Sequence, residues 1–198
     1  MENAKRGFEK LFIAEILVII GSFSLFVTKE YWYLAIAFIV IDIAAFFINL
    51  KGLKLMAKDQ EGYKMAYSFA IFGIVVDVVS LVLAVVFDSK SEAANILNNT
   101  TVALSDAIEF AICFIVLNTS IKYLQSVGNE ELAKYADTTK NLLLFAYCVS
   151  IAIDFYLSTN IESWVALIGI IAGLTALVVV IIGQIRYIIF LKKMKETL

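Results

Sequence analysis

Six long apolar segments follow one another along this chain, separated by short polar stretches. A helix that crosses the hydrocarbon core of a bilayer needs about 20 predominantly apolar residues, and each segment comes close to or exceeds that length. The chain is 62% hydrophobic and only 17% charged, whereas a soluble domain carries about a quarter charged residues. The sequence therefore predicts an all-α, polytopic membrane protein in which residues 1–198 form one transmembrane domain. The predicted spanning segments are 8–27, 32–50, 66–87, 102–124, 141–158 and 163–190.

The distribution of lysine and arginine predicts how the six segments cross the membrane. Of the 16 basic residues, only Lys29 and Lys90 fall in the connections on one side. The others lie at the two ends of the chain and in the second and fourth connections. Because lysine and arginine accumulate on the cytoplasmic side, we expect a multi-pass protein of the cell membrane with both termini in the cytoplasm.

Internal similarity groups the segments into pairs. The stretch LKLMAKDQEGYKMA at 53–66 resembles IKYLQSVGNEELAKYA at 121–136, and both are expected to form short amphipathic segments on the cytoplasmic side. Aligning them brings Asp42 and Glu109 to matching positions. Chance similarity between apolar sequences is the alternative explanation. The repeat predicts three tandem hairpins, at 8–65, 66–140 and 141–198.

The stretch KRGFEKLFIAEIL, together with GLKLMAKDQEGYK and QSVGNEELAKYA, resembles a group of small multi-pass membrane proteins of low-GC Gram-positive bacteria. The likeness extends over most of the chain. It implies a bacterial plasma-membrane protein, and it carries over no activity, cofactor or site residue.

Acidic residues interrupt the predicted spans. A charge at the centre of a spanning helix costs about 2.5–3.5 kcal/mol on insertion scales. Only Arg186, near the cytoplasmic end of the last segment, could offset these charges, so protonation, hydration in a cavity or a bound cation must compensate for them. We therefore expect the three most central acids, Asp42, Asp77 and Glu109, to bind a proton or a cationic substrate. A protonated acid that hydrogen-bonds across helices is the structural alternative.

Three further acids lie nearer the ends of the predicted spans. Asp154 and Asp106 fall towards the outer boundary, and Glu15 lies towards the cytoplasm. They are candidates for the mouths of a path that begins or ends at the central acids. Simple exposure to water at the membrane interface is the alternative for all three.

Several classes of function lack their characteristic residues. The chain has no histidine and no GxSxG, HExxH or P-loop motif, so we expect neither an enzyme nor catalytic residues. Cys113 and Cys148 lie in apolar segments without a CxxC motif and are expected to be small buried side chains, and neither a metal site nor a cofactor is predicted. The net charge of −2, without a basic aromatic patch, argues against a nucleic-acid partner.

Two functions from different classes remain. The intramembrane acids favour a small transporter or channel for a cation or a proton-coupled solute. The absence of proline, the usual device for breaking a spanning helix, and the lack of a transport motif favour instead a scaffold, chaperone or accessory subunit of a membrane complex. The expected partners are the lipid bilayer, a small cation or solute, and a second copy of the chain or another membrane protein.

Overall fold

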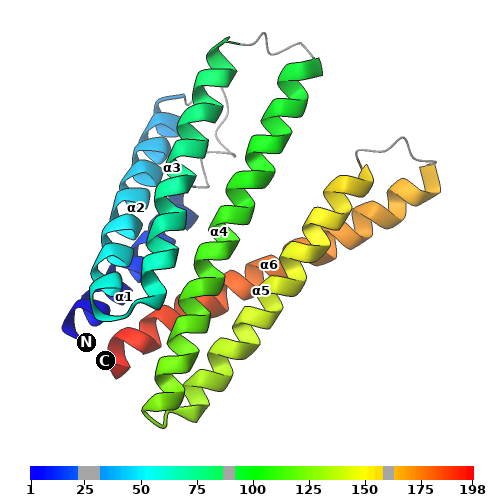
Figure 1. The fold of residues 1–198 in the computed structure, drawn as a ribbon. Coiled ribbons are helices and arrows are strands. Elements are labelled where there is room, and N and C mark those ends of the chain that lie inside the picture. Colours follow the sequence, from blue (N-terminus) through cyan, green and yellow to red (C-terminus); the bar gives the residue numbers. More distant parts are fainter. Residues whose placement is uncertain (22–31, 87–91, 158–162) are drawn as a thin grey trace. The chain divides into compact units, whose positions relative to one another are not determined.

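The computed structural model describes residues 1–21, 32–86, 92–157 and 163–198, and within them the chain forms six α-helices and no β-strand (Figure 1). The all-α class is therefore confirmed. The described part of each predicted apolar segment lies within one helix. The helices are α1 (Glu2–Gly21), α2 (Trp32–Asp59), α3 (Gly62–Val86), α4 (Glu92–Ser126), α5 (Glu130–Leu157) and α6 (Ser163–Thr197).

The helices extend well beyond the apolar segments on the predicted cytoplasmic side. α2 continues to Asp59, and α5 begins at Glu130. The two amphipathic stretches predicted as separate segments are thus continuous with the long helices. Each stretch contains one turn between two helices, at 60–61 or at 127–129. The rest of each stretch extends the helices on either side, because Lys, Leu, Met, Ala and Glu, which dominate it, are good helix formers.

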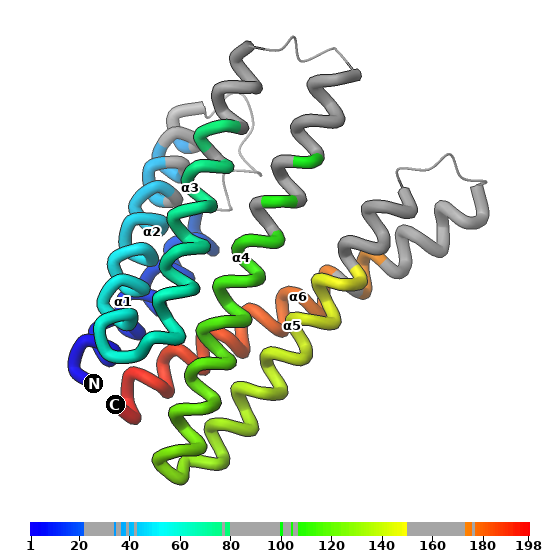
Figure 2. The backbone as a smooth tube through the Cα atoms, in the orientation of Figure 1, coloured from blue at the N-terminus to red at the C-terminus, as the bar shows by residue number. Residues whose placement is uncertain are grey.

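A well-defined turn joins α4 to α5, and Figure 2 shows the chain reversing direction there. Gly128 has a φ of 75°, and the amides of Gly128 and Asn129 donate to the carbonyls of Gln125 and Leu124. This is the hydrogen-bond pattern of a helix end closed by a left-handed glycine. The side chain of Asn129 then accepts a hydrogen bond of 3.2 Å from the amide of Leu132, which caps the first turn of α5.

Two helical segments among the described residues are long and apolar enough to cross a membrane. They are Ala107–Ser126 and Gly173–Thr197, with mean hydropathies of 1.5 and 2.3, and Gly62–Val76 is a shorter apolar segment. Core helices of soluble proteins can show the same length and composition. The six predicted spans therefore stay a prediction, and the membrane location is argued below.

The chain divides into two compact units, residues 1–67 with 188–198 and residues 68–187. The two ends of the chain lie close together in the first unit (Figure 1). There Glu9 and Lys195 form an ion pair of 3.4 Å, and the ring of Phe8 packs edge-on against Phe190. The predicted hairpin repeats are not tested by this division.

The packing of α1 against α2 forms the core of the first unit. The buried positions of α1 recur every three or four residues, which defines one face of the helix. Gly7 and Gly52 bring the two backbones together: a Cβ atom on Gly7 would lie 2.8 Å from the carbonyl oxygen of Gly52, and one on Gly52 would lie 2.9 Å from that of Gly7. Small residues are required wherever two helices approach this closely.

The second unit has its core where α4 packs against α5. Val116, Leu117 and Leu124 of α4 are buried, as are Leu143 and Ala146 of α5. The two cysteines differ in their surroundings. Cys113 is buried as predicted, whereas Cys148 is exposed, as is Leu144 four residues before it on α5.

Candidate functional site

Glu15 lies on the face of α1 that packs against the rest of the first unit. Only 8% of its surface is exposed, and Leu11 and Ala14 beside it on the same face are 1% and 0% exposed. This burial argues against the alternative of simple exposure to water, and a place for Glu15 at the mouth of a path stays a prediction. Tertiary packing buries this carboxyl group, although Lys10 is only five residues away in the sequence.

The contacts between α1 and α2 fix the height of Glu15 along α2. Ala4 is hydrogen-bonded to Asp59, Gly7 faces Met56, and Leu11 faces Gly52. Each step forward along α1 matches an equal step backward along α2, as in an antiparallel pair. Continuing the same register places Glu15 level with Ile48, and so next to Asn49.

Asn49 of α2 is a polar residue at nearly the same height as Glu15. It follows Ala45 by four residues and precedes Leu53 by four, and both of these are fully buried, so Asn49 lies on the contact face of α2. Its Oδ1 atom is buried and accepts no hydrogen bond from the described residues. A buried acceptor without a donor costs about 1–3 kcal/mol. The α1–α2 pair thus carries a buried carboxyl group and an unsatisfied amide oxygen at nearly the same height.

Asp42 lies one turn before Ala45 in α2 and continues the same spacing of three and four residues. At a rise of 1.5 Å per residue, its backbone is roughly 10 Å from that of Asn49 along the helix. The side chain of Asp42 lies outside the described residues, as do the side chains of three other predicted acids: Asp77, Asp106 and Asp154.

Glu109 is the remaining predicted acid. It lies in α4, within the candidate span Ala107–Ser126, and its side chain is exposed. Glu15 belongs to the first unit and Glu109 to the second. Among the described residues, no group of three or more histidine, cysteine, aspartate or glutamate side chains is arranged to hold a metal ion.

A cluster around Asp59 went unrecognised in the sequence. The carboxylate of Asp59, at the end of α2, accepts hydrogen bonds of 2.9 Å from the side-chain amide of Asn3 and from the backbone amide of Ala4. The amino group of Met1 lies 3.2 Å away. The hydrogen bond from Asn3, supported by the one from Ala4, lowers the pKa of Asp59 below its ordinary value of 3.8, although partial burial opposes the shift. Asp59 therefore caps the N-terminus of α1 from another helix, and no local sequence motif predicts such a contact.

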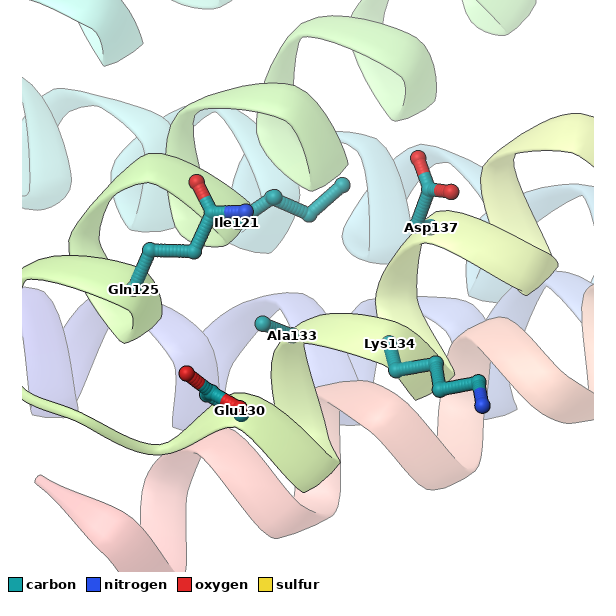
Figure 3. Close-up of a pocket in the computed structure, with 6 residues that line it drawn as sticks. All are labelled: Ile121, Gln125, Glu130, Ala133, Lys134 and Asp137. Atoms are coloured by element: carbon teal, nitrogen blue, oxygen red, sulfur yellow. The ribbon is translucent and has the colours of Figure 1, made fainter.

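A polar hollow of about 450 Å³ lies between the end of α4 and the start of α5 (Figure 3). Its charged side chains are of both signs, and Glu130 and Lys134 are exposed. Asp137 is paired with Lys140 at 2.7 Å. These features are typical of a solvated helix junction. The hollow is lined by Ile121, Gln125, Glu130, Ala133, Lys134 and Asp137.

Comparisons with protein-family models, with curated proteins and with solved structures found no significant match to this chain.

Proposed function

We propose that this chain is a small multi-pass protein of the cell membrane, with six spanning helices and both termini in the cytoplasm, that transports a cation or a proton-coupled solute. The observation that carries the proposal is the burial of the Glu15 carboxyl group at the height of the unsatisfied Oδ1 atom of Asn49. Both groups can bind a cation or a chemical group that carries a proton.

The exposed apolar surface supports a membrane location. On α2, Val40, Ile43 and Phe47 follow one another at spacings of three and four residues and are 58%, 52% and 62% exposed. On α6, Leu174, Leu177 and Ile181 repeat this spacing and are 60%, 55% and 50% exposed. Soluble monomers rarely expose large contiguous apolar patches. Lipid chains would cover such side chains, and the two apolar helical segments of α4 and α6 have the length to span the hydrocarbon core.

The choice of a cation follows from the chemistry of the two groups. An ionised carboxylate and an amide oxygen are hydrogen-bond acceptors. Oxygen atoms of these kinds also coordinate hard cations. A proton, an ammonium group or a metal cation would satisfy Asn49 and bind to Glu15 as well. Asp42 continues the spacing of three and four residues along α2 and is therefore the next carboxyl group along such a path. Asp77 and Glu109 are candidates for the continuation of the path.

The rigidity of the helix pair supports a fixed site. Gly7 and Gly52 hold the two backbones in contact, and the bonds from Asp59 fix the beginning of α1 against the end of α2. Sites on rigid helices are held more accurately than sites on loops.

The proposal is tested by thermal unfolding of the purified full chain across pH and with a panel of alkali cations and amines, followed by flux in liposomes. A ligand at 100 times its Kd stabilises the folded state by about 2.7 kcal/mol. We expect one cation or amine, or a change in proton concentration, to shift the melting temperature of the wild type and of Glu2→Gln. Glu15→Gln should lose both the shift and the flux. Glu2 is a matched control because it lies on the same helix and its side chain is 76% exposed.

A non-transporting scaffold or accessory subunit is the second candidate. The exposed apolar side chains on α2, α3 and α6 fit a protein partner in the membrane as well as they fit lipid. If Glu15→Gln leaves the melting temperature unchanged and neither protein moves any cation, the transport proposal is wrong and the scaffold is favoured.

A further inference from the structure

Contacts with α5 hold Arg186 of α6 in place, and these contacts all lie within the second unit. The guanidinium carbon lies 4.3 Å from the centre of the Tyr135 ring. Its Nε atom donates a hydrogen bond of 3.3 Å to the Thr139 hydroxyl, and the Tyr135 hydroxyl donates one of 3.4 Å to the backbone carbonyl of Arg186. The guanidinium is therefore fixed on an aromatic ring.

Thr139 strengthens this arrangement. It is fully buried, and its hydroxyl donates a hydrogen bond of 2.8 Å to the carbonyl of Tyr135. Its proton is thus committed to α5, and its oxygen is left to accept from Arg186. The orientation of the guanidinium plane is determined by the stacking on one side and by the Nε bond at one edge.

The opposite edge of the guanidinium is available. The two Nη atoms of Arg186 form no hydrogen bond or ion pair with any residue in the described parts of the chain. The side chain of Asp137, a carboxylate on the same stretch of α5, is already paired with Lys140 at 2.7 Å. A full positive charge and four N–H donors therefore remain in a fixed plane.

We propose that the Nη atoms of Arg186 bind a phosphate group. The planar guanidinium matches two oxygen atoms of a phosphate in a bidentate pair, and prior fixation of the side chain reduces the entropy lost on binding. The phosphate can come from an anionic phospholipid headgroup or from a soluble phosphate compound. The lipid source rests on the proposed membrane location, whereas the phosphate site itself does not depend on transport.

The position of Arg186 in the chain favours the lipid. It lies in the apolar segment Gly173–Thr197, and Lys192, Lys193 and Lys195 follow it in the sequence. Basic residues at the cytoplasmic end of a spanning helix attract anionic headgroups. Lysines attract such headgroups through their charge without a defined geometry, while the fixed guanidinium adds a defined binding geometry.

The test is lipid binding by the purified full chain in an uncharged detergent, followed by native mass spectrometry. Phosphatidylglycerol, phosphatidylcholine and inorganic phosphate are titrated separately. The variants are Arg186→Gln and Arg186→Lys, with Arg6→Gln as the matched control. Arg6 is the only other arginine of the chain, its side chain is 64% exposed, and its loss changes the net charge by the same amount.

We expect the wild type and Arg6→Gln to bind phosphatidylglycerol equally well and much more tightly than phosphatidylcholine. Arg186→Gln should weaken phosphatidylglycerol binding by about tenfold, as expected for the loss of charge-assisted hydrogen bonds. Arg186→Lys should weaken it several-fold, because a lysine keeps the charge and loses the planar pair of donors. If inorganic phosphate binds with the same dependence on Arg186 and competes with the lipid, the site stands and a soluble phosphate is its source.

Equal phosphatidylglycerol affinity of Arg186→Gln and Arg6→Gln would overturn the proposal, since it would show that only net charge matters. Should Arg186→Gln not fold, Arg186→Lys decides alone: an affinity equal to that of the wild type would exclude recognition by the guanidinium plane.

Discussion

Gly7 of α1 and Gly52 of α2 lie backbone against backbone, each with its Cα facing the other's carbonyl oxygen so closely that neither has room for a Cβ atom. The contact lies between the Asp59 cap at the start of α1 and the buried carboxyl group of Glu15. The height of Glu15 against Asn49 therefore depends on this approach.

Gly52→Ala should destabilise the first unit. The new methyl group would lie 2.9 Å from the Gly7 carbonyl oxygen, and a backbone atom cannot move aside as a flexible side chain can. Overpacking of this kind costs about 1–3 kcal/mol, measured as a lower melting temperature of the purified protein. Gly73→Ala is the control, because its methyl group would meet only a side-chain methyl of Ile108 at 3.3 Å, and its cost should be offset by the higher helix propensity of alanine. Equal melting temperatures of the two variants would contradict the close packing.

Gly128 is required for a different reason, its backbone conformation. No atom of the described residues lies within 4 Å of a Cβ placed there, yet its φ is 75°. Gly128→Ala should therefore destabilise the α4–α5 turn by about 1 kcal/mol through the left-handed conformation alone. Gly128→Asn should cost less, because asparagine tolerates this conformation. Denaturant unfolding of both variants measures the difference, and a smaller cost for alanine than for asparagine would argue against the turn.

Length and hydropathy were sufficient to locate the six helices, because a run of about 20 apolar residues has few other outcomes. The ends of the helices were harder to predict. α2 and α5 include LKLMAKD and EELAKYADTTK. The charged residues of these stretches suggested a change of structure, but the high helix propensity of their residues extends the helices through them.

The surroundings of individual side chains were less predictable still. Exposure to water was the alternative for Glu15, but burial depends on which face of α1 meets α2, and Glu15 is 8% exposed. Asp59 caps α1 across a separation of 56 residues from Asn3, and Arg186 stacks on Tyr135 from another helix. Such contacts are set by helix pairing, which a single sequence specifies only weakly.

Asp59→Ala should destabilise the protein by about 1 kcal/mol at neutral pH, the usual cost of losing a helix cap. The pKa of Asp59 is lowered in the folded state from its ordinary value of 3.8, so its contribution is fully present above that pH. The contribution is lost as the pH falls through the lower pKa of the folded state. The difference in melting temperature between the wild type and Asp59→Ala should therefore shrink below about pH 4. Glu61→Ala, at a side chain that is 90% exposed, should show no such trend.

Asn49→Leu separates a structural role of the amide from a functional one. If Asn49 serves only packing, its buried Oδ1 atom without a donor is a cost, and leucine should raise the melting temperature at every pH and in every cation. If the amide oxygen helps to hold a cation or proton beside Glu15, the same variant should be more stable without ligand and should lose the ligand-dependent shift that Glu15→Gln also loses. Thermal unfolding of both single variants and of the double variant decides the matter.

Ligand shifts in Asn49→Leu as large as in the wild type would remove Asn49 from the site and leave Glu15 alone in the proposal. If the double variant loses less of the ligand-dependent shift than the sum of the two single losses, the two residues bind the same cation or proton.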